Sequence, residues 1–255
     1  MPNPVIDVIT QHGSARQYKP DALPAALIET IVAAAQRASS SSNLQAYSVV
    51  AVTDAAKRQR LAELCGNQRH IAEAPVFLAW CADLARLQRV CELQGYQENT
   101  DFFESFLVAA VDAVIAAQTA ALAAESEGLG ICYIGSIRNQ PAAAIDLLGL
   151  PPLVFPVTGM TLGWPAAAPV IRPRLPLDAV LHWEGYDTRG QDEALAAYDQ
   201  AMLATGIYRD RQVQPGGAAA PAARYGWLEH TARRVSQAMR VELKDVIAKQ
   251  GFGLK

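Results

Sequence analysis

The segment from residue 102 to residue 127 constrains the fold more than any other part of this chain. It reads FFESFLVAAVDAVIAAQTAALAAESE, contains neither Gly nor Pro, and consists largely of residues that favour a helix. From residue 106 to residue 122 its only polar side chains are Asp112, Gln118 and Thr119. A helix that is apolar on nearly every face has to be buried on nearly every face. We therefore expect it at the centre of a protein core or of a dimer interface.

Burial in a membrane is the alternative for this segment. Asp112 would then lie near the centre of the bilayer, where a carboxylate is costly. The segment also lacks an uninterrupted run of about 18 apolar residues. We therefore favour the protein interior, with Gly128 ending the helix and a short apolar strand at 131–134 leading into a glycine turn.

The composition is that of a folded protein without an evident macromolecular partner. Hydrophobic residues make up 51% and charged residues 18% of the 255 residues, so the chain is globular rather than disordered. The net charge of −3 gives no reason to expect nucleic acid or an anionic membrane as a partner. The first residues show neither the charged region nor the long apolar run of a signal peptide. We expect a cytoplasmic protein.

Cysteine and histidine spacing argues against a metal site. The four cysteines have no CxxC spacing, and we interpret them as reduced, inert thiols: Cys65, Cys81, Cys91 and Cys132. The four histidines have no ligand spacing either, and no catalytic dyad is assigned to them: His12, His70, His182 and His230.

Patterns of hydrophobicity predict a layered fold. Four strand candidates lie among at least six helix candidates, which indicates an α+β or α/β core. The strands are expected at 46–52, 76–82, 131–134 and 154–162. Besides the central helix, helices are expected at 24–38, 55–65, 83–93, 141–148, 192–203 and 227–250, with a flexible loop at 214–223.

Common nucleotide-binding and hydrolase motifs are absent from the sequence. Gly128, Gly130 and Gly135 follow a helix and lead into a strand, the reverse of the strand-to-helix order of a dinucleotide fingerprint. The sequence also has no GxxxxGK[ST], HExxH or GxSxG pattern. No catalytic residue is therefore assigned.

Several polar segments are suited to holding a cofactor instead. The turn at 12–16 combines a glycine, a hydroxyl and an arginine, which suits a phosphate, although an ordinary surface turn is the alternative. The loop at 39–45 is rich in hydroxyls and amides, which suit a polar heterocycle. Arg172 and Arg174 alternate with prolines in an arm that can clamp an anion, with a solvated basic linker as the alternative.

A polar turn at 68–70 and a backbone turn at 133–136 complete this set. Where a cofactor carries the chemistry, the protein needs to supply only binding, orientation and electrostatics. The sequence therefore predicts a protein that works through a bound cofactor.

Six short motifs follow one another along the chain. They are HxSxR at 12–16, SSSSxLQ at 39–45, GxQxH at 66–70, AESxGLGxxYIG at 124–135, LGWP at 162–165 and RPRLP at 172–176. In this order they resemble the nitroreductase superfamily of FMN flavoproteins. The chain looks most similar to the branch of NADPH-dependent, oxygen-insensitive major nitroreductases and flavin reductases, from about residue 5 to residue 200.

The resemblance implies an α+β fold of three layers, in which helices flank a central mixed sheet. It also implies a domain-entwined homodimer built around the long buried helix, with one FMN at each end of the interface. The chain would divide into an FMN-binding core at 1–190 and a C-terminal helical excursion at 191–255.

The same resemblance implies which residues bind FMN. The phosphate and the ribityl chain would be held by the turn that contains Gly13 and by the groups of His12, Ser14, Arg16, Arg172 and Arg174. The partner subunit would contribute Ser39, Ser40 and Ser41, and the flavin ring would lie near Gln68 and His70. Backbone N–H groups would face the ring from Tyr133, Ile134, Gly135 and Ser136.

The chain departs from the family pattern at three places. Gly13 stands where the family has an arginine, so one cationic contact is missing. Arg172 replaces a lysine and keeps the charge, and Ser136 replaces a second glycine. The branch binds the 2′-phosphate of NADPH through arginines of the excursion, for which the candidates are Arg209, Arg211 and Arg224.

These observations predict an FMN-dependent oxidoreductase that uses NAD(P)H, with NADPH favoured over NADH. In a ping-pong cycle, NAD(P)H would reduce the flavin and leave before a small acceptor takes two electrons. The candidate acceptors are nitroaromatics, quinones, free flavin, azo dyes and chromate. The alternatives are a dedicated NAD(P)H:flavin reductase and a flavin-binding module without turnover.

Overall fold

The computed structural model describes residues 3–209, 212–213 and 224–255. These residues form two units. The first, here called the core unit, comprises Met1–Val170 and Glu242–Lys255, and the second, the excursion unit, comprises Ile171–Val241. The division expected at residue 190 falls inside the excursion unit.

The core unit is built on a four-stranded sheet of β1 (Tyr47–Val52), β2 (Val76–Asp83), β3 (Gly130–Ile134) and β4 (Val154–Gly163). Each predicted strand is confirmed to within one residue at either end. The helices described in this unit are α1 (Pro4–Thr10), α2 (Ala25–Ala35), α3 (Ala55–Leu64), α4 (Arg69–Glu73), α5 (Ala85–Gln94), α6 (Phe103–Ser126), α7 (Pro141–Leu148) and α10 (Leu243–Lys249). Short 3₁₀ turns lie at η1 (Ser41–Asn43) and η2 (Gly135–Arg138).

The sheet has the order β1-β2-β4-β3, and each neighbouring pair of strands is antiparallel. The α+β class is confirmed, but the expectation of a mixed sheet is corrected for the strands of the described chain. The reason lies in the connections, because Val52 at the end of β1 pairs with Phe77 at the start of β2. The helices α3 and α4 therefore return the chain to the same end of the sheet, instead of crossing to the far end as a parallel connection does.

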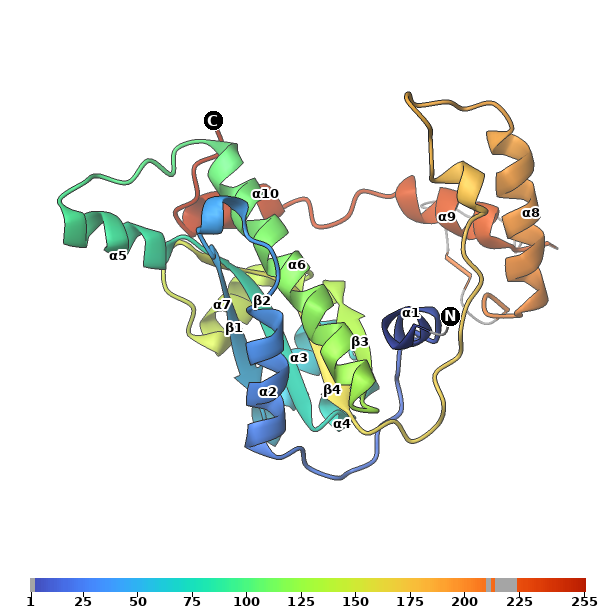
Figure 1. Ribbon diagram of the computed structural model, residues 1–255, viewed down its shortest axis with the longest axis horizontal. Helices are drawn as coiled ribbons and strands as arrows, with labels where there is room; N and C mark the ends of the chain where they lie inside the picture. Colours follow the sequence, from blue (N-terminus) through green and yellow to red (C-terminus); the bar gives the residue numbers. More distant parts are fainter. Residues whose placement is uncertain (1–2, 210–211, 214–223) are drawn as a thin grey trace. The chain divides into compact units, whose positions relative to one another are not determined.

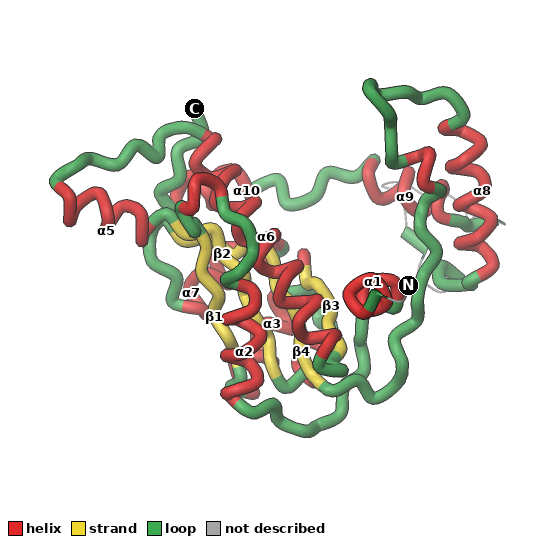
Figure 2. Tube along the Cα trace, viewed as in Figure 1, coloured by secondary structure: helices red, strands yellow, loops and turns green. Residues whose placement is uncertain are grey.

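Alternating side chains of β2 define three layers. Val76, Leu78 and Trp80 pack with α2 and α6 on one face of the sheet. Phe77 and Ala79 pack with α3, α4 and α7 on the other face. Figure 2 shows the sheet between these two groups of helices. The inner strand β2 is buried along its whole length, as expected for a sheet that is covered by helices on both faces.

The long helix α6 faces the core with small side chains. They let it lie close to the sheet and beside α2 (Figure 1). Its opposite side leaves Leu107, Val111 and Val114 exposed by 44%, 47% and 45%. Within one chain the helix therefore buries one face and exposes an apolar stripe on the other. A single chain does not bury nearly every face of the helix, although the sequence predicted such burial. The buried residues of α6 are Ala109, Asp112, Ala113, Ala116, Ala117, Ala120, Ala121 and Ala124.

The helix α6 also has the length and the apolar composition of a membrane-spanning helix. Its alanine face is nevertheless packed inside the protein. Asp112 is 1% exposed and accepts hydrogen bonds from Ser40, Ser41 and Ala46. These contacts are those of a core helix, in agreement with the sequence.

The excursion unit contains η3 (Leu177–Ala179), α8 (Gln191–Ala204) and α9 (Trp227–Val235). The ring of Tyr198 on α8 meets the ring of Trp227 edge to face, with centroids 5.0 Å apart. Tyr208 stacks on His230 of α9 at 4.3 Å. Aromatic contacts of this kind hold the two helices together.

The single helix expected at 227–250 is wrong, because the segment forms α9 and α10 with a break between them. Arg240, within the break, has a left-handed φ of 54°, which a continuous right-handed helix excludes. Ile247 of α10 is buried in the core unit, whereas α9 packs on α8 in the excursion unit. The apolar periodicity continues across the break because α9 and α10 are each amphipathic, and each helix buries its apolar face against a different unit.

Candidate functional site

The N-terminal turn that carries the predicted phosphate ligands lies along β3. The Ala15 N–H donates to the Ile131 carbonyl oxygen at 2.8 Å. Gly130 permits this approach, because a Cβ there would lie 2.5 Å from the Cβ of Ala15. The buried Tyr18 hydroxyl donates to the Ala15 carbonyl oxygen at 2.9 Å and lies 2.7 Å from the Thr161 hydroxyl. The turn is therefore fixed to the sheet.

His12 is held by the end of α6. Its Nδ1 atom lies 2.6 Å from Oε1 of Glu125. Since a carboxylate only accepts hydrogen bonds, the ring carries its proton on Nδ1 and keeps Nε2 for another contact. Glu125 belongs to one of the motifs of the resemblance, but the sequence assigned it no role.

Gly13 is buried against the end of the core unit. A Cβ at this position would lie 2.9 Å from the Cβ of Pro169 and 2.9 Å from the carbonyl oxygen of Val170. Any side chain here would force the backbone or Pro169 to move. Gly13, which stands where the resemblance expects an arginine, therefore lies in a tightly packed turn.

Arg16 lies within electrostatic reach of His70 and Cys132. Burial lowers the pKa of His70, and the positive charge of Arg16 lowers this pKa further. Burial raises the pKa of Cys132, while Arg16 and a hydrogen bond to Ser14 oppose that rise. The structure therefore brings the first predicted segment next to the polar turn that contains His70.

Gln68 connects the polar turn at 68–70 to the segment that follows β3. Its Nε2 atom donates to the Ser136 Oγ at 2.5 Å and to the Cys65 carbonyl oxygen at 2.8 Å. Ser136 lies in η2, which begins at Gly135. The predicted backbone turn after β3 is therefore present, and a side-chain contact links it to the 68–70 turn.

This donor set fits FMN. Arg16 supplies a cation and Ser14 a hydroxyl, which together suit a phosphate. The buried Nε2 atom of His70 has no hydrogen-bond partner among the described residues. A buried polar atom without a partner is rare in folded proteins and is accounted for by a bound molecule or water. Gln68 and Ser136 add the donors and acceptors that a polar heterocycle requires.

The serine loop, defined as residues 39–46, lies elsewhere on the core unit. Its Ser40 hydroxyl donates to Asp112, whereas His12 contacts Glu125. Asp112 and Glu125 are 13 residues apart on α6, which corresponds to about 20 Å along the helix axis. One chain therefore does not bring the serine loop to the cluster around Arg16.

Arg172 and Arg174 belong to the excursion unit. The Arg174 Nη1 atom donates to the carbonyl oxygens of Arg172 and Pro173, each at 3.2 Å. The Tyr198 hydroxyl of α8 also donates to the Pro173 carbonyl oxygen, at 3.3 Å. The basic arm is therefore packed onto α8 and is not a free linker.

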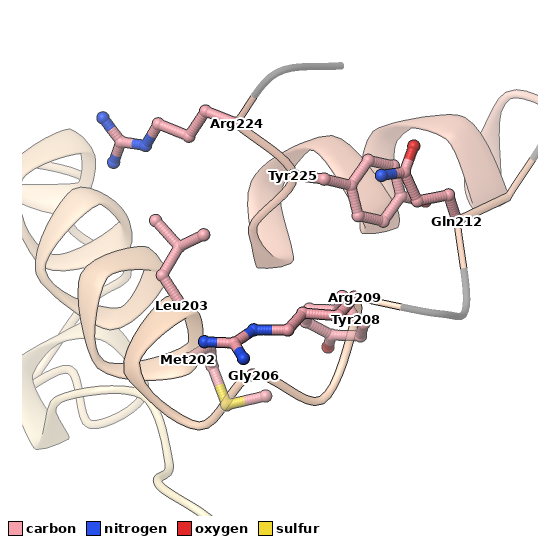
Figure 3. A pocket seen from close by; sticks show the side chains of 8 residues that line it. All are labelled: Met202, Leu203, Gly206, Tyr208, Arg209, Gln212, Arg224 and Tyr225. Atoms are coloured by element: carbon pink, nitrogen blue, oxygen red, sulfur yellow. The ribbon is translucent and has the colours of Figure 1, made fainter. Parts of the chain in front are cut away.

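Two of the three predicted NADPH ligands line a pocket of about 390 Å³ within the excursion unit. Figure 3 shows Arg209, after α8, and Arg224, before α9, among the residues that surround it. Arg224 forms an ion pair with the buried Asp199 at 3.3 Å, and the Leu228 N–H donates to the same carboxylate at 2.9 Å. Arg211 lies outside the described residues. The described residues that line the pocket are Met202, Leu203, Gly206, Tyr208, Arg209, Gln212, Arg224 and Tyr225.

Sequence reasoning missed two acidic residues of α6 that organise the polar segments. Glu125 fixes His12, and Asp112 fixes the serine loop. Asp112 had one visible signal, because it is the only charged residue from 106 to 122. In the sequence analysis, Asp112 was used only as an argument against burial in a membrane. A buried carboxylate also requires hydrogen-bond donors nearby, and this requirement would have pointed to a contact with a polar loop.

Two protein-family matches together cover most of the chain. Residues 9–164 match the Nitroreductase family, and residues 172–255 match the Nitroreductase family, C-terminal domain.

Curated relatives match over nearly the whole length of the chain. A Cr(VI) reductase of Pseudomonas sp. (strain G-1) is 37% identical over 253 residues, covering 98% of this chain and 100% of the relative. An FMN reductase (NADPH) of Bacillus subtilis (strain 168) is 37% identical over 257 residues, covering 98% of each.

Solved structures share the fold. NfrA2 of B. megaterium superimposes with a TM-score of 0.91 at 37% identity and covers 100% of both chains. The NADPH:FMN oxidoreductase of Vibrio harveyi, solved as a complex with NAD+, gives a TM-score of 0.87 at 34% identity and covers 99% of this chain and 100% of that one.

Proposed function

We infer that this chain, which belongs to the nitroreductase family, is an FMN-dependent oxidoreductase that takes its electrons from NAD(P)H. The observation that carries the inference is the cluster of Ser14, Arg16, Gln68, His70 and Ser136 in a chain of this family. Bound FMN supplies two-electron redox chemistry, so the chain needs no nucleophile of its own.

The residues of the core unit divide the binding of FMN between them. Arg16 and Ser14 hold the phosphate, with His12 oriented by Glu125 beside them. His70 and Gln68 lie toward the ring. Burial and Arg16 keep His70 neutral, so its Nε2 atom can exchange a hydrogen bond with a polar edge.

The backbone from Tyr133 to Ser136 would supply N–H groups to the ring, and such donors would favour negative charge on the reduced cofactor. Arg172 and Arg174 would add positive charge for the phosphate. Residues 1–190 would hold the cofactor, and residues 191–255 would complete the fold.

A homodimer completes the site. The serine loop is about 20 Å along α6 from the His12 turn, so the loop that carries Ser39, Ser40 and Ser41 would reach FMN in the partner's site. The exposed stripe of Leu107, Val111 and Val114 gives α6 an apolar face for the second copy.

NADPH is the preferred electron donor in this proposal, with Arg209 as the ligand of the 2′-phosphate. Arg209 lines the pocket and has no ion-pair partner among the described residues. Arg224 is already paired with the buried Asp199, which fits a structural role better. In a ping-pong cycle, a nitroaromatic or a quinone would then take the electrons, with a dedicated flavin reductase as the second candidate.

The absorption spectrum of the purified protein tests the function directly. We expect a bound-flavin spectrum that bleaches on anaerobic addition of NADPH and recovers on addition of an acceptor. Turnover with a nitrofuran, a quinone and free FMN then separates a broad reductase from a dedicated flavin reductase. A colourless protein that takes up no added FMN contradicts the proposal.

A further inference from the structure

We propose that Asp112 is the positioning residue that sets the serine loop in its cofactor-binding shape. The inference rests on the proposed function, because it takes the loop to be part of the FMN site. Asp112 itself is 1% exposed and lies on the buried side of α6.

Within the described part of the chain, three hydrogen bonds reach the Asp112 carboxylate, and each comes from the serine loop. The Ser40 hydroxyl donates to Oδ2 at 2.7 Å, and the Ala46 N–H donates to the same oxygen at 3.1 Å. The Ser41 N–H donates to Oδ1 at 3.0 Å. One buried carboxylate thus holds both ends of the loop, and the donors in turn satisfy its charge.

The loop has a backbone that needs such support. Ser42, Asn43 and Gln45 have left-handed φ values of 48°, 57° and 52° without being glycine. Residues in this region persist where the surroundings fix them, and they cluster at ligand-binding segments. Their presence here indicates a loop built in advance for a ligand.

A second set of contacts fixes the side of the loop away from α6. The Arg86 Nη1 atom donates to the carbonyl oxygens of Gln45 and Tyr47, each at 3.2 Å. The Asp83 N–H donates to the Ala46 carbonyl oxygen at 3.0 Å. The loop is therefore held between α6 and the end of the sheet, and Asp112 is its only described anchor on α6.

These contacts divide the roles of the three serines. The Ser40 hydroxyl donates to Asp112 and accepts from the Gln45 N–H at 2.6 Å, so its hydrogen-bonding capacity is largely used inside the loop. Ser39 and Ser41 have exposed side chains. Ser39 and Ser41 are therefore the cofactor ligands, and Ser40 is the support that links them to Asp112.

The test compares wild type with Asp112→Asn, which keeps the side-chain volume but turns an amide N–H₂ toward loop donors. FMN binding is measured by quenching of flavin fluorescence, and hydrogen exchange is measured at the Ser41 and Ala46 amides. We expect FMN to bind roughly tenfold more weakly, or about 1.4 kcal/mol, and both amides to exchange faster. An unchanged dissociation constant with unchanged exchange overturns the proposal.

Asp54→Ala is the matched control. It removes the hydrogen bond from the Lys57 N–H that caps α3, and so lowers stability at a site remote from the loop. Its FMN affinity should equal that of wild type. An equal loss of affinity in Asp54→Ala and Asp112→Asn would assign the effect to general stability and reject the positioning role.

Ser40→Ala provides a second route if Asp112→Asn does not fold. It should speed exchange at the Gln45 amide and weaken FMN binding, whereas normal exchange and binding in this variant contradict the assignment. Hydrogen exchange reports on the loop without FMN. A wild-type protein that binds no FMN therefore defeats the proposed function, while the exchange data still decide whether Asp112 holds the loop.

Discussion

The carboxylate of Glu125, near the end of α6, lies 2.6 Å from Nδ1 of His12 in the N-terminal turn. This contact joins the longest helix of the core unit to the first predicted FMN ligand. It sets the His12 tautomer and leaves Nε2 available for the cofactor.

Glu125→Gln should weaken FMN binding while leaving the fold intact. The change replaces a charge-assisted hydrogen bond by a neutral one, a difference of about 1 kcal/mol, or roughly fivefold in affinity. Titration of the apoprotein with FMN measures the effect. Glu127→Gln, an exposed neighbour, is the control and should bind FMN as wild type does. Equal affinities in the two variants would remove His12 from the site.

Gly13→Ala should destabilise the protein by about 1–3 kcal/mol, because the added Cβ would overlap Pro169 and the Val170 carbonyl oxygen. Chemical denaturation measures the loss. Gly185→Ala is the control, since a Cβ at Gly185 meets no atom of the described residues within 4 Å. By the same reasoning, Gly13→Arg should not increase the affinity for FMN, because its side chain does not fit the turn. Tighter binding of FMN by Gly13→Arg would contradict this steric explanation.

His70 should make stability depend on pH below neutrality. Its folded-state pKa lies below the ordinary value of 6.5 because of burial and Arg16. As the pH falls through 6.5, the unfolded chain binds a proton that the folded chain does not, so the free energy of unfolding decreases. The decrease stops once the pH is below the folded-state pKa.

Denaturation of wild type and His70→Gln from pH 8 to pH 5 measures this contribution. His230 also has a lowered pKa, so the informative quantity is the difference between the two proteins. Wild type should lose more stability than His70→Gln on acidification. Parallel curves would show that His70 titrates in the folded state as it does in the unfolded chain.

Much of the fold could be predicted because its signals are local. The runs that form β1 to β4 are short, apolar and rich in strand-forming residues. Strand direction was not predictable in this way, because it depends on where the α3–α4 connection returns. The break near Arg240 was also invisible, since amphipathic periodicity continued through it.

The motifs that the resemblance assigns to FMN were visible in the sequence, but the contacts that hold these segments in place were not. Asp112 contacts residues 66 to 72 positions away in the chain, and Glu125 contacts a residue 113 positions away. No local pattern reports such pairings. The proposed division between Ser40 as support and Ser41 as ligand likewise rests on the Ser40 hydroxyl being the one that the fold places beside Asp112.

Val111→Glu should separate the proposed homodimer and release FMN. Val111 is 47% exposed on the apolar stripe of α6, and a carboxylate buried in an apolar interface is strongly unfavourable. Sedimentation analysis and flavin content, measured on the same sample, test both effects. Val90→Glu on α5, at a valine that is 51% exposed, is the control. A Val111→Glu monomer that keeps stoichiometric FMN would contradict the shared site.

Replacement of Arg209 should change the KM for NADPH, whereas replacement of Arg224 should change the stability of the protein. Arg209→Ala removes a cation that lines the pocket, so KM for NADPH should rise roughly 10- to 150-fold, because a charge-assisted contact contributes ~1.5–3 kcal/mol, while KM for NADH stays unchanged.

Arg224→Ala instead leaves the buried Asp199 without its ion-pair partner and should destabilise the excursion unit by about 1–3 kcal/mol. Steady-state kinetics with both nucleotides, alongside thermal unfolding, distinguishes the two roles. An Arg224→Ala enzyme of normal stability with a selective defect for NADPH would reverse the assignment, because Arg224 would then bind the 2′-phosphate and its contact with Asp199 would only orient it.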